Sequence, residues 1–260
     1  MKLSTLSGVA ISIASLFLLA SCGNSQIRYG SDKQTLTINK KIYELEWNDE
    51  FDGTELDTSK WGYRLGQRRT GFWVEDAVQL DGKGNLNMSA YEKDGQRCSG
   101  AIETFKTYMT CYGYFEMRCD LSDGEGHWPS FWIQTPTFRK FQNDPGRGGA
   151  EIDIMEYWVL TPRKIHNSVH WNGLDDKLIT RTKASNIPNL NKGFNVIGVE
   201  WTPTEYVFYV DGKEIFRVEE GISHIEEFMI LSDEWPGEIE KANLPDKFIV
   251  DYVRVYKAEK

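Results

Sequence analysis

The sequence has no excess of basic residues and no basic block. Its 30 lysines and arginines are outnumbered by 39 aspartates and glutamates, which leaves a formal net charge of −9. Proteins bind nucleic acids largely through phosphate contacts, and these contacts require clustered positive charge. The composition therefore argues against DNA or RNA as a partner.

Cysteine is also scarce, with four residues in a chain of 260. One lies near the N-terminus, so Cys98, Cys111 and Cys119 allow at most one intramolecular bridge in the rest of the chain. Their spacing fits no zinc pattern, and none lies beside a histidine that could activate it. We interpret them as ordinary strand residues, with a Cys98–Cys119 bridge across a hairpin near Tyr108 left open.

The N-terminal apolar run is too short for a membrane-spanning helix, which needs about 20 such residues. It covers residues 9–20 and is interrupted by Ser12 and Ser15. The Leu-Ala-Ser-Cys sequence at 19–22 resembles a bacterial lipoprotein box, in which Cys22 becomes the lipidated first residue of the mature chain. A secretory peptide cleaved nearby is the alternative, and both alternatives imply export.

The chain is accordingly divided into three segments. We expect a lipoprotein signal peptide over residues 1–21, a polar tether over 22–37 that contains glycine and serine, and one globular domain over 38–260. The lipid anchor would be the only contact with the membrane, at the periplasmic face or the cell surface. We expect a monomer.

Strand patterns dominate the predicted domain. Residues 204–218 form two alternating segments around Asp211-Gly212, which is a strong hairpin signal. Helical periodicity is scarce, and the other alternating stretches lie at 114–121, 130–134, 151–157, 195–201 and 247–256. The pattern predicts an all-β protein, built as a sandwich of two antiparallel sheets.

Residues 149–157 concentrate acidic side chains. Because side chains alternate along a strand, Glu151 and Asp153 share a face, whereas Glu156 would point into the core as a costly buried carboxylate. A β-bulge over the two residues after Asp153 would bring Glu156 to the same face. The segment thus predicts three acids on one surface, with an exposed strand face solvated by acids as the alternative.

The spacing of these acids suits glycoside hydrolysis. With the bulge, the α-carbons of Glu151 and Glu156 would be roughly 13 Å apart at about 3.3 Å per step. Side chains that lean together could then reach the separation of about 5–5.5 Å between the carboxyl groups of retaining glycosidases. Asp153 between them could hydrogen-bond one carboxylate and raise the pKa of the acid/base.

Tryptophan is abundant, with nine residues in the chain. Flat indole rings provide surfaces on which sugar rings stack. Trp128 and Trp132 are four positions apart and would share a face of one strand, so they are candidate substrate-binding residues. Packing in the core is the alternative for each.

These motifs resemble, in order, those of the glycoside hydrolase family 16 enzymes, which have a β-jelly-roll fold with an open concave cleft. The stretch 151–156 resembles the bulged catalytic signature of laminarinases, agarases and their relatives. The ordered set covers nearly the whole domain, at 47–53, 112–118, 126–132, 151–156, 200–203, 209–212 and 250–256.

The resemblance implies specific roles. Glu151 would be the nucleophile, Glu156 the general acid/base and Asp153 the assisting carboxylate. His170 would lie on the neighbouring strand and face the cleft to bind substrate, with a structural histidine as the alternative. The resemblance implies no cofactor for catalysis.

A structural calcium is common in the family, and Glu50 and Asp251 could contribute oxygens to it. Calcium takes six to eight oxygen ligands, so two residues leave the metal site unknown. The sequence also departs from the family pattern at Ala101, at Asp76, after Tyr157 and over 135–147, which weakens the substrate assignment more than the catalytic one.

The sequence therefore predicts an endo-acting retaining hydrolase of a polysaccharide or oligosaccharide, first of all of β-1,3- or mixed-linkage β-glucan. An endo-β-galactanase-type enzyme for agar-type, galactan or mucin-type glycans is the runner-up. A non-catalytic glycan-binding protein is the alternative from another class, but binding alone does not require two glutamates on a bulged strand. No residue decides between hydrolysis and transglycosylation.

Overall fold

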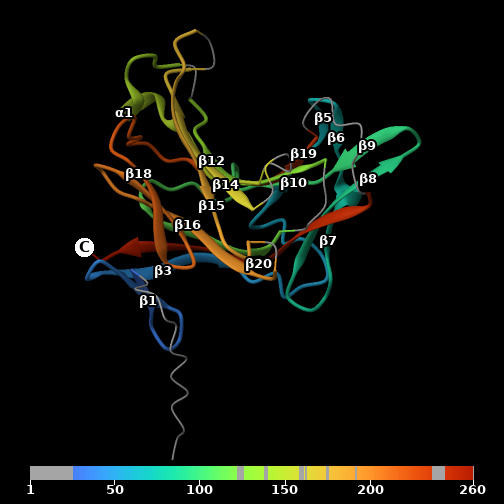
Figure 1. Ribbon diagram of the computed structural model, residues 1–260, viewed down its shortest axis with the longest axis horizontal. Helices are drawn as coiled ribbons and strands as arrows, with labels where there is room; N and C mark the ends of the chain where they lie inside the picture. The colour runs from blue at the N-terminus through green and yellow to red at the C-terminus, as the bar shows by residue number, and fades with distance from the viewer. Residues whose placement is uncertain are drawn as a thin grey trace, which may run out of the picture.

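The computed structural model describes residues 26–121, 126–137, 140–157, 161, 163–173, 176–190, 192–235 and 244–259. The predicted signal peptide and Cys22 lie outside the described residues. Two β-sheets stack to form a sandwich, as the alternating sequence predicts (Figure 1). In the ranges given above, no helix has the length and apolar character needed to cross a membrane.

The larger sheet has 13 strands and the order β18-β17-β16-β11-β20-β8-β9-β6-β5, with β3, β2 and β1 continuing from β20 and β7 paired with β8. β6 and β9 pair in parallel. The strands are β1 (Ile27–Tyr29), β2 (Thr35–Ile38), β3 (Lys41–Asp49), β5 (Gly66–Arg68), β6 (Gly71–Trp73), β7 (Val78–Leu80), β8 (Leu86–Lys93), β9 (Gln96–Ser99), β11 (Gly113–Asp120), β16 (Asn195–Trp201), β17 (Tyr206–Val210), β18 (Lys213–Val218) and β20 (Asp246–Ala258).

The smaller sheet has seven antiparallel strands in the order β15-β14-β13-β12-β19-β10-β4. Its strands are β4 (Gly62–Tyr63), β10 (Ala101–Glu103), β12 (Trp128–Gln134), β13 (Ala150–Glu156), β14 (Lys164–Trp171), β15 (Ile179–Asn186) and β19 (Phe228–Glu234). Two short helical turns complete the elements, η1 (Glu75–Ala77) and α1 (Pro145–Gly148). The hairpin predicted around Asp211-Gly212 is confirmed as β17 and β18.

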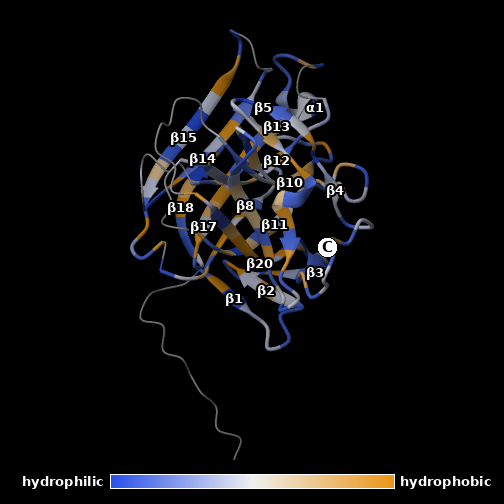
Figure 2. Cartoon of the chain, turned by 90° about the vertical axis from the view of Figure 1, so that its right-hand side faces the viewer, coloured by the Kyte–Doolittle hydropathy of each residue, from blue (hydrophilic) through white to orange (hydrophobic). Residues whose placement is uncertain are grey.

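The main core lies between the two sheets. Alternate side chains of facing strands, such as Phe115 and Met117 of β11 and Ile152 of β13, are at most 1% exposed and belong to one apolar cluster. In Figure 2 orange, hydrophobic positions alternate with blue, hydrophilic ones along the strands. One face of the smaller sheet is thereby used for packing, and its other face is free to carry polar side chains.

The N-terminal strands differ from the tether expected over 22–37. β1 pairs with β2, and β2 with β3. Ile27, Leu36 and Ile38 are at most 4% exposed and pack with Tyr114 and Tyr209 on the outer face of the larger sheet. The apolar alternation within this short polar segment makes it part of the fold, because burying these side chains offsets the entropy of ordering them.

The three cysteines within the described ranges form no bridge. Cys98, Cys111 and Cys119 are free thiols. Cys98 lies on β9 and Cys119 on β11, and β8 and β20 separate these two strands. The expected Cys98–Cys119 hairpin is wrong because β10, which lies between them in the chain, belongs to the other sheet.

Candidate active site

The acidic strand β13 carries the predicted bulge. In its pairing with β14, Asp153 lies opposite Ser168 and Glu156 opposite His166, so three steps on β13 match two on β14. The extra residue restores the alternation, and Glu156 therefore shares a face with Asp153 and Glu151. Asp153 is 5% exposed, so the alternative of a solvated strand face is wrong.

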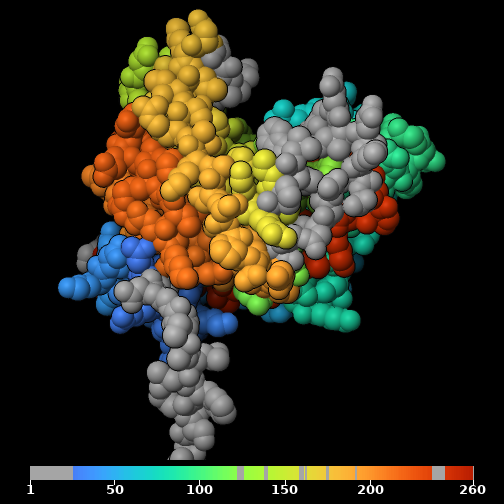
Figure 3. All heavy atoms as spheres, in the orientation of Figure 1, coloured from blue at the N-terminus to red at the C-terminus, as the bar shows by residue number. Residues whose placement is uncertain are grey.

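The three acids line one cavity. Trp128 and Trp132 also line it, as predicted, and the remaining lining residues are Arg68, Arg69, Ser130 and Glu234. Trp132 serves the core as well, since it is 6% exposed and packs against Phe228 and Ile230. Figure 3 shows the surface hollowed between the lobe that carries β15 and the lobe that carries β8 and β9.

Glu151 is oriented by β12. The side-chain amide nitrogen Nε2 of Gln134 donates a hydrogen bond to Glu151 Oε2 at 2.8 Å. Gln134 lies opposite Glu151 in the register between β12 and β13. The contact holds one carboxylate oxygen and leaves the other available for chemistry.

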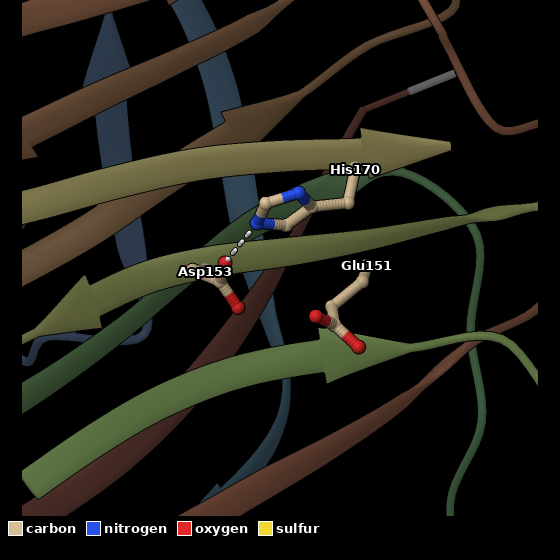
Figure 4. Close-up of side chains that lie close together, drawn as sticks. All are labelled: Glu151, Asp153 and His170. Carbon is tan, nitrogen blue, oxygen red and sulfur yellow. Dashed lines mark ion pairs between the residues drawn. The ribbon is translucent and has the colours of Figure 1, made fainter. Parts of the chain in front are cut away.

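Asp153 and His170 form a second contact beside Glu151 (Figure 4). His170 Nε2 lies 3.1 Å from Asp153 Oδ2, and His170 Nδ1 lies 2.8 Å from the hydroxyl of Thr180 on β15. Burial first, and then the charge of Glu151, raises the pKa of Asp153 well above its usual range. His170 thus reaches the catalytic strand from β14, but its polar contacts are with Asp153 and Thr180.

Glu156 has the electrostatics of a proton donor. Burial is the main cause that raises its pKa to about 9, and the charges of Asp153, Glu151 and Glu234 add to it, while His170 opposes them. The carboxyl group therefore holds its proton at neutral pH. A general acid in glycoside hydrolysis needs such a raised pKa.

The comparison with protein families agrees with this geometry. The model of the glycosyl hydrolases family 16 matches residues 23–254. The chain belongs to this family. Family 16 enzymes are retaining, endo-acting glycoside hydrolases, and the two-sheet sandwich is their jelly roll.

Known relatives of this family 16 chain act on different glycans. It is 29% identical to a β-glucanase from Rhodothermus marinus, over 83% of this chain and 85% of that protein. It is 28% identical to a keratan-sulfate endo-1,4-β-galactosidase from Sphingobacterium multivorum, over 85% of this chain and 57% of that protein. The structure of an endo-β-1,3-glucanase from Pyrococcus furiosus covers 87% of this chain with a TM-score of 0.74 and 26% identity, and 99% of that chain is matched.

The structural calcium that the family resemblance left open does not fit Glu50 and Asp251, the two residues named for it. Arg254 donates two hydrogen bonds to Glu50, from Nε at 2.8 Å and from Nη2 at 2.7 Å. Asp251 pairs with Arg118. A cation would have to displace a guanidinium group from each carboxylate. Among the described residues, the group of three His, Cys, Asp or Glu side chains close enough to share a metal ion is Glu151, Asp153 and His170, whose ligand atoms lie within 4.8 Å of one another.

Four site residues of this family 16 enzyme were not predicted from the sequence, namely Arg68, Arg69, Gln134 and Glu234. Gln134 is the last residue of β12, and its alternation with Trp132 was the signal that could have identified it. The two arginines come from a short hairpin far from β13 in the chain, and no local pattern links that hairpin to the acids. Only the folded chain brings them into the cavity.

Proposed function

We propose that Glu151, Glu156 and Asp153 carry out the hydrolysis in this family 16 enzyme. Glu151 attacks the anomeric carbon while Glu156 donates its proton to the glycosidic oxygen, which gives a glycosyl-enzyme and a free leaving sugar. Glu156 then takes a proton from water, which attacks the same carbon and releases Glu151. Asp153 contacts His170, and its charge helps to raise the pKa of Glu156. The bulge of β13 carries this proposal, since it sets the three carboxylates on one face.

Conservative substitutions test these roles. We expect Glu151→Gln and Glu156→Gln each to lower kcat on polysaccharide by about 10²-fold or more, because the nucleophile or the proton donor is lost at unchanged size. The Glu156→Gln protein should retain turnover of aryl glycosides with good leaving groups, and azide should accelerate it. Circular dichroism checks the fold. Full activity of Glu151→Gln would overturn the assignment.

The stereochemistry of the product is an independent test. Two displacements at one carbon restore its configuration, so early products should appear as the β-anomer in proton NMR. An initial α-anomer would mean direct attack by water and would exclude Glu151 as the nucleophile.

We propose β-1,3- or mixed-linkage β-glucan as the first substrate class. The support is the glucan-cleaving activity named for the relatives from Rhodothermus marinus and Pyrococcus furiosus. Trp128 and Trp132 in the cavity wall offer apolar indole surface to the sugar rings, and His170 lies beside Asp153. Oligosaccharides of several sizes should appear early in a digest of laminarin or cereal glucan, whereas steady release of one monosaccharide would contradict internal cleavage.

An endo-β-galactanase-type activity is the second candidate. The keratan-sulfate relative supports it, because that enzyme aligns with 85% of this chain. A digest of agar-type, galactan or mucin-type glycans, measured by reducing sugar, separates the two classes. The same catalytic residues would serve either substrate.

We further propose that the protein is exported as a lipoprotein anchored through Cys22. The support is the Leu-Ala-Ser-Cys sequence at the end of the N-terminal apolar run. An extracytoplasmic site suits an enzyme whose polymers are too large to import. Metabolic labelling with a palmitate analogue should mark the wild type, and a Cys22→Ser protein without label would confirm the attachment point.

A further inference from the structure

Two consecutive arginines occupy the cavity beside the acids. Arg68 ends β5 and Arg69 begins the turn to β6, and both line the same cavity as Glu151 and Glu156. They are 38% and 47% exposed in their side chains. Neither has a part in the hydrolysis derived above.

One buried carboxylate orients both guanidinium groups. The Nε atom of Arg68 donates to Glu234 Oε1 at 2.9 Å, and the Nε atom of Arg69 donates to Glu234 Oε2 at 2.6 Å. The Glu234 side chain is 7% exposed, and its two oxygens are both used. Three charged groups therefore leave one net positive charge at this end of the cavity.

Each guanidinium group lies over a tryptophan ring. The central carbon Cζ of Arg68 lies 5.2 Å from the ring centre of Trp73, and that of Arg69 lies 4.9 Å from the ring centre of Trp128. Such cation–π contacts restrict a side chain that is otherwise flexible. The hydrogen bond of each group to Glu234 uses Nε and leaves the terminal nitrogens Nη1 and Nη2 out of it.

The hairpin that carries the arginines is fastened to the end of β19. The indole nitrogen of Trp73 donates to the carbonyl of Asp233 at 2.8 Å, and Thr70 Oγ1 donates to the carbonyl of Trp235 at 3.3 Å. Gly71 packs so closely that a β-carbon there would lie 2.3 Å from Trp235 Cδ1. The arginine pair is thus held in place before any ligand binds, which lowers the cost of binding.

We propose that Arg68 and Arg69 bind an anionic substituent of the glycan, a sulfate ester or a carboxylate, next to the point of cleavage. This inference rests on the proposed hydrolase function and specifies its substrate. Among the described residues, the terminal nitrogens of both arginines have no hydrogen-bond or ion-pair partner. A guanidinium edge matches two oxygens of sulfate or carboxylate, and two such edges on a net positive centre favour an anion over a neutral hydroxyl. The unsubstituted β-glucans proposed above as the first substrate class offer no such group, so the arginine pair favours a charged chain, which the second, galactan-type class can provide.

Matched pairs of charged and neutral chains test the proposal. The substrates are a sulfated galactan and its desulfated product, and a uronate-bearing glycan and its carboxyl-reduced product. Wild-type kcat/KM should be higher on the charged member of at least one pair, and the pair that responds identifies the anion. Equal values on both members of both pairs would overturn the proposal.

Variants then assign the preference to the arginines. Arg69→Gln should lower kcat/KM on the preferred charged chain by about tenfold or more, the usual effect of losing a charge-assisted hydrogen bond, and should lower it less on the matched neutral chain. Arg69→Lys keeps the charge beside Glu234 and should fall between, which covers the case in which Arg69→Gln does not fold. Arg181→Gln is the control, because Arg181 also pairs with a glutamate and lies over a tryptophan, outside the cavity. Equal losses on charged and neutral chains would mean that the arginines only support the fold.

A binding measurement separates this proposal from the hydrolase function. Calorimetry with the Glu151→Gln protein and charged or neutral oligosaccharides needs no turnover. Tighter binding of the charged member, weakened by Arg69→Gln and by added salt, supports the anion site even if wild-type hydrolysis is not found on these chains. Equal binding of both members would overturn the anion site while leaving the catalytic assignment intact.

Discussion

Single residues of the cavity differ in charge state because their surroundings differ. Burial and the charges of neighbouring carboxylates raise the pKa of Glu156 to about 9. Glu234, in the same cavity, accepts hydrogen bonds from two arginines. The same residue type therefore serves as a proton donor at one position and as an anchor for cations at another.

The pH dependence of hydrolysis should follow Glu156. The acid must be protonated to act, so kcat/KM should hold through neutral pH and fall as the pH rises past about 9. Asp153→Asn removes a charge that raises this pKa, so the alkaline limb should move to lower pH. Asp251→Asn, on a carboxylate paired with Arg118, is the control. An unmoved limb in Asp153→Asn would show that Asp153 is uncharged while Glu156 titrates.

His127 should make stability depend on pH. Burial alone would lower its pKa, but Asp233 and Asp246, at 2.7 and 2.8 Å, outweigh burial and raise the pKa from 6.5 to about 10. Because the folded pKa is raised, the stabilisation is complete below about pH 6.5 and is lost as the pH rises towards 10.

His127→Gln breaks this buried group of charges and should cost about 3–5 kcal/mol near neutral pH. Urea unfolding at several pH values should show a smaller cost in alkaline solution, where the wild type has lost the charge as well. His166→Gln, on a histidine bonded to Thr161, is the matched control. A cost that does not change with pH would contradict the charged state of His127.

Elements of the fold place the site from both sides. β13 presents the acids through its bulge, and the β5–β6 hairpin adds the arginines from the other sheet. On the far side, β1 and β2 cover the outer face of the larger sheet. Tyr29 of β1 donates a hydrogen bond to the buried carboxylate of Glu116, and Tyr43 of β3 donates one to that of Glu200. These N-terminal strands are therefore a structural part of the domain.

Ile38 should show how much the N-terminal strands contribute. Ile38 is 0% exposed in β2, so Ile38→Ala should cost about 2–5 kcal/mol of unfolding free energy through lost burial and a cavity. Ile42 in β3 is 43% exposed, and Ile42→Ala should change it by less than about 0.5 kcal/mol. Denaturant unfolding compares the two. Equal small effects would mean that β1 and β2 behave as a tether in solution.

We expect the whole molecule to supply its chemistry from its own side chains. Hydrolysis by two carboxylates requires no metal, and Glu50 and Asp251 are paired with arginines. We therefore expect a chelator to change neither kcat on the substrate nor the thermal unfolding midpoint. A loss of activity restored by calcium would contradict this, and a shift of the midpoint alone would indicate a structural ion.

The sequence by itself determined the fold class, the hairpin of β17 and β18, and the shared face of Glu151, Asp153 and Glu156. Those follow from local rules, since the period of a strand and the cost of a buried carboxylate act over a few residues. Only the tertiary structure decided what surrounds these acids. The turn that carries Arg68 reaches Glu234 across 166 positions of the chain, and the polar N-terminal segment became strands because a distant sheet face offered it apolar contacts. Contacts between distant segments produce no periodic pattern in the sequence. Each residue that makes such a contact resembles a surface residue when only its neighbours in the chain are considered.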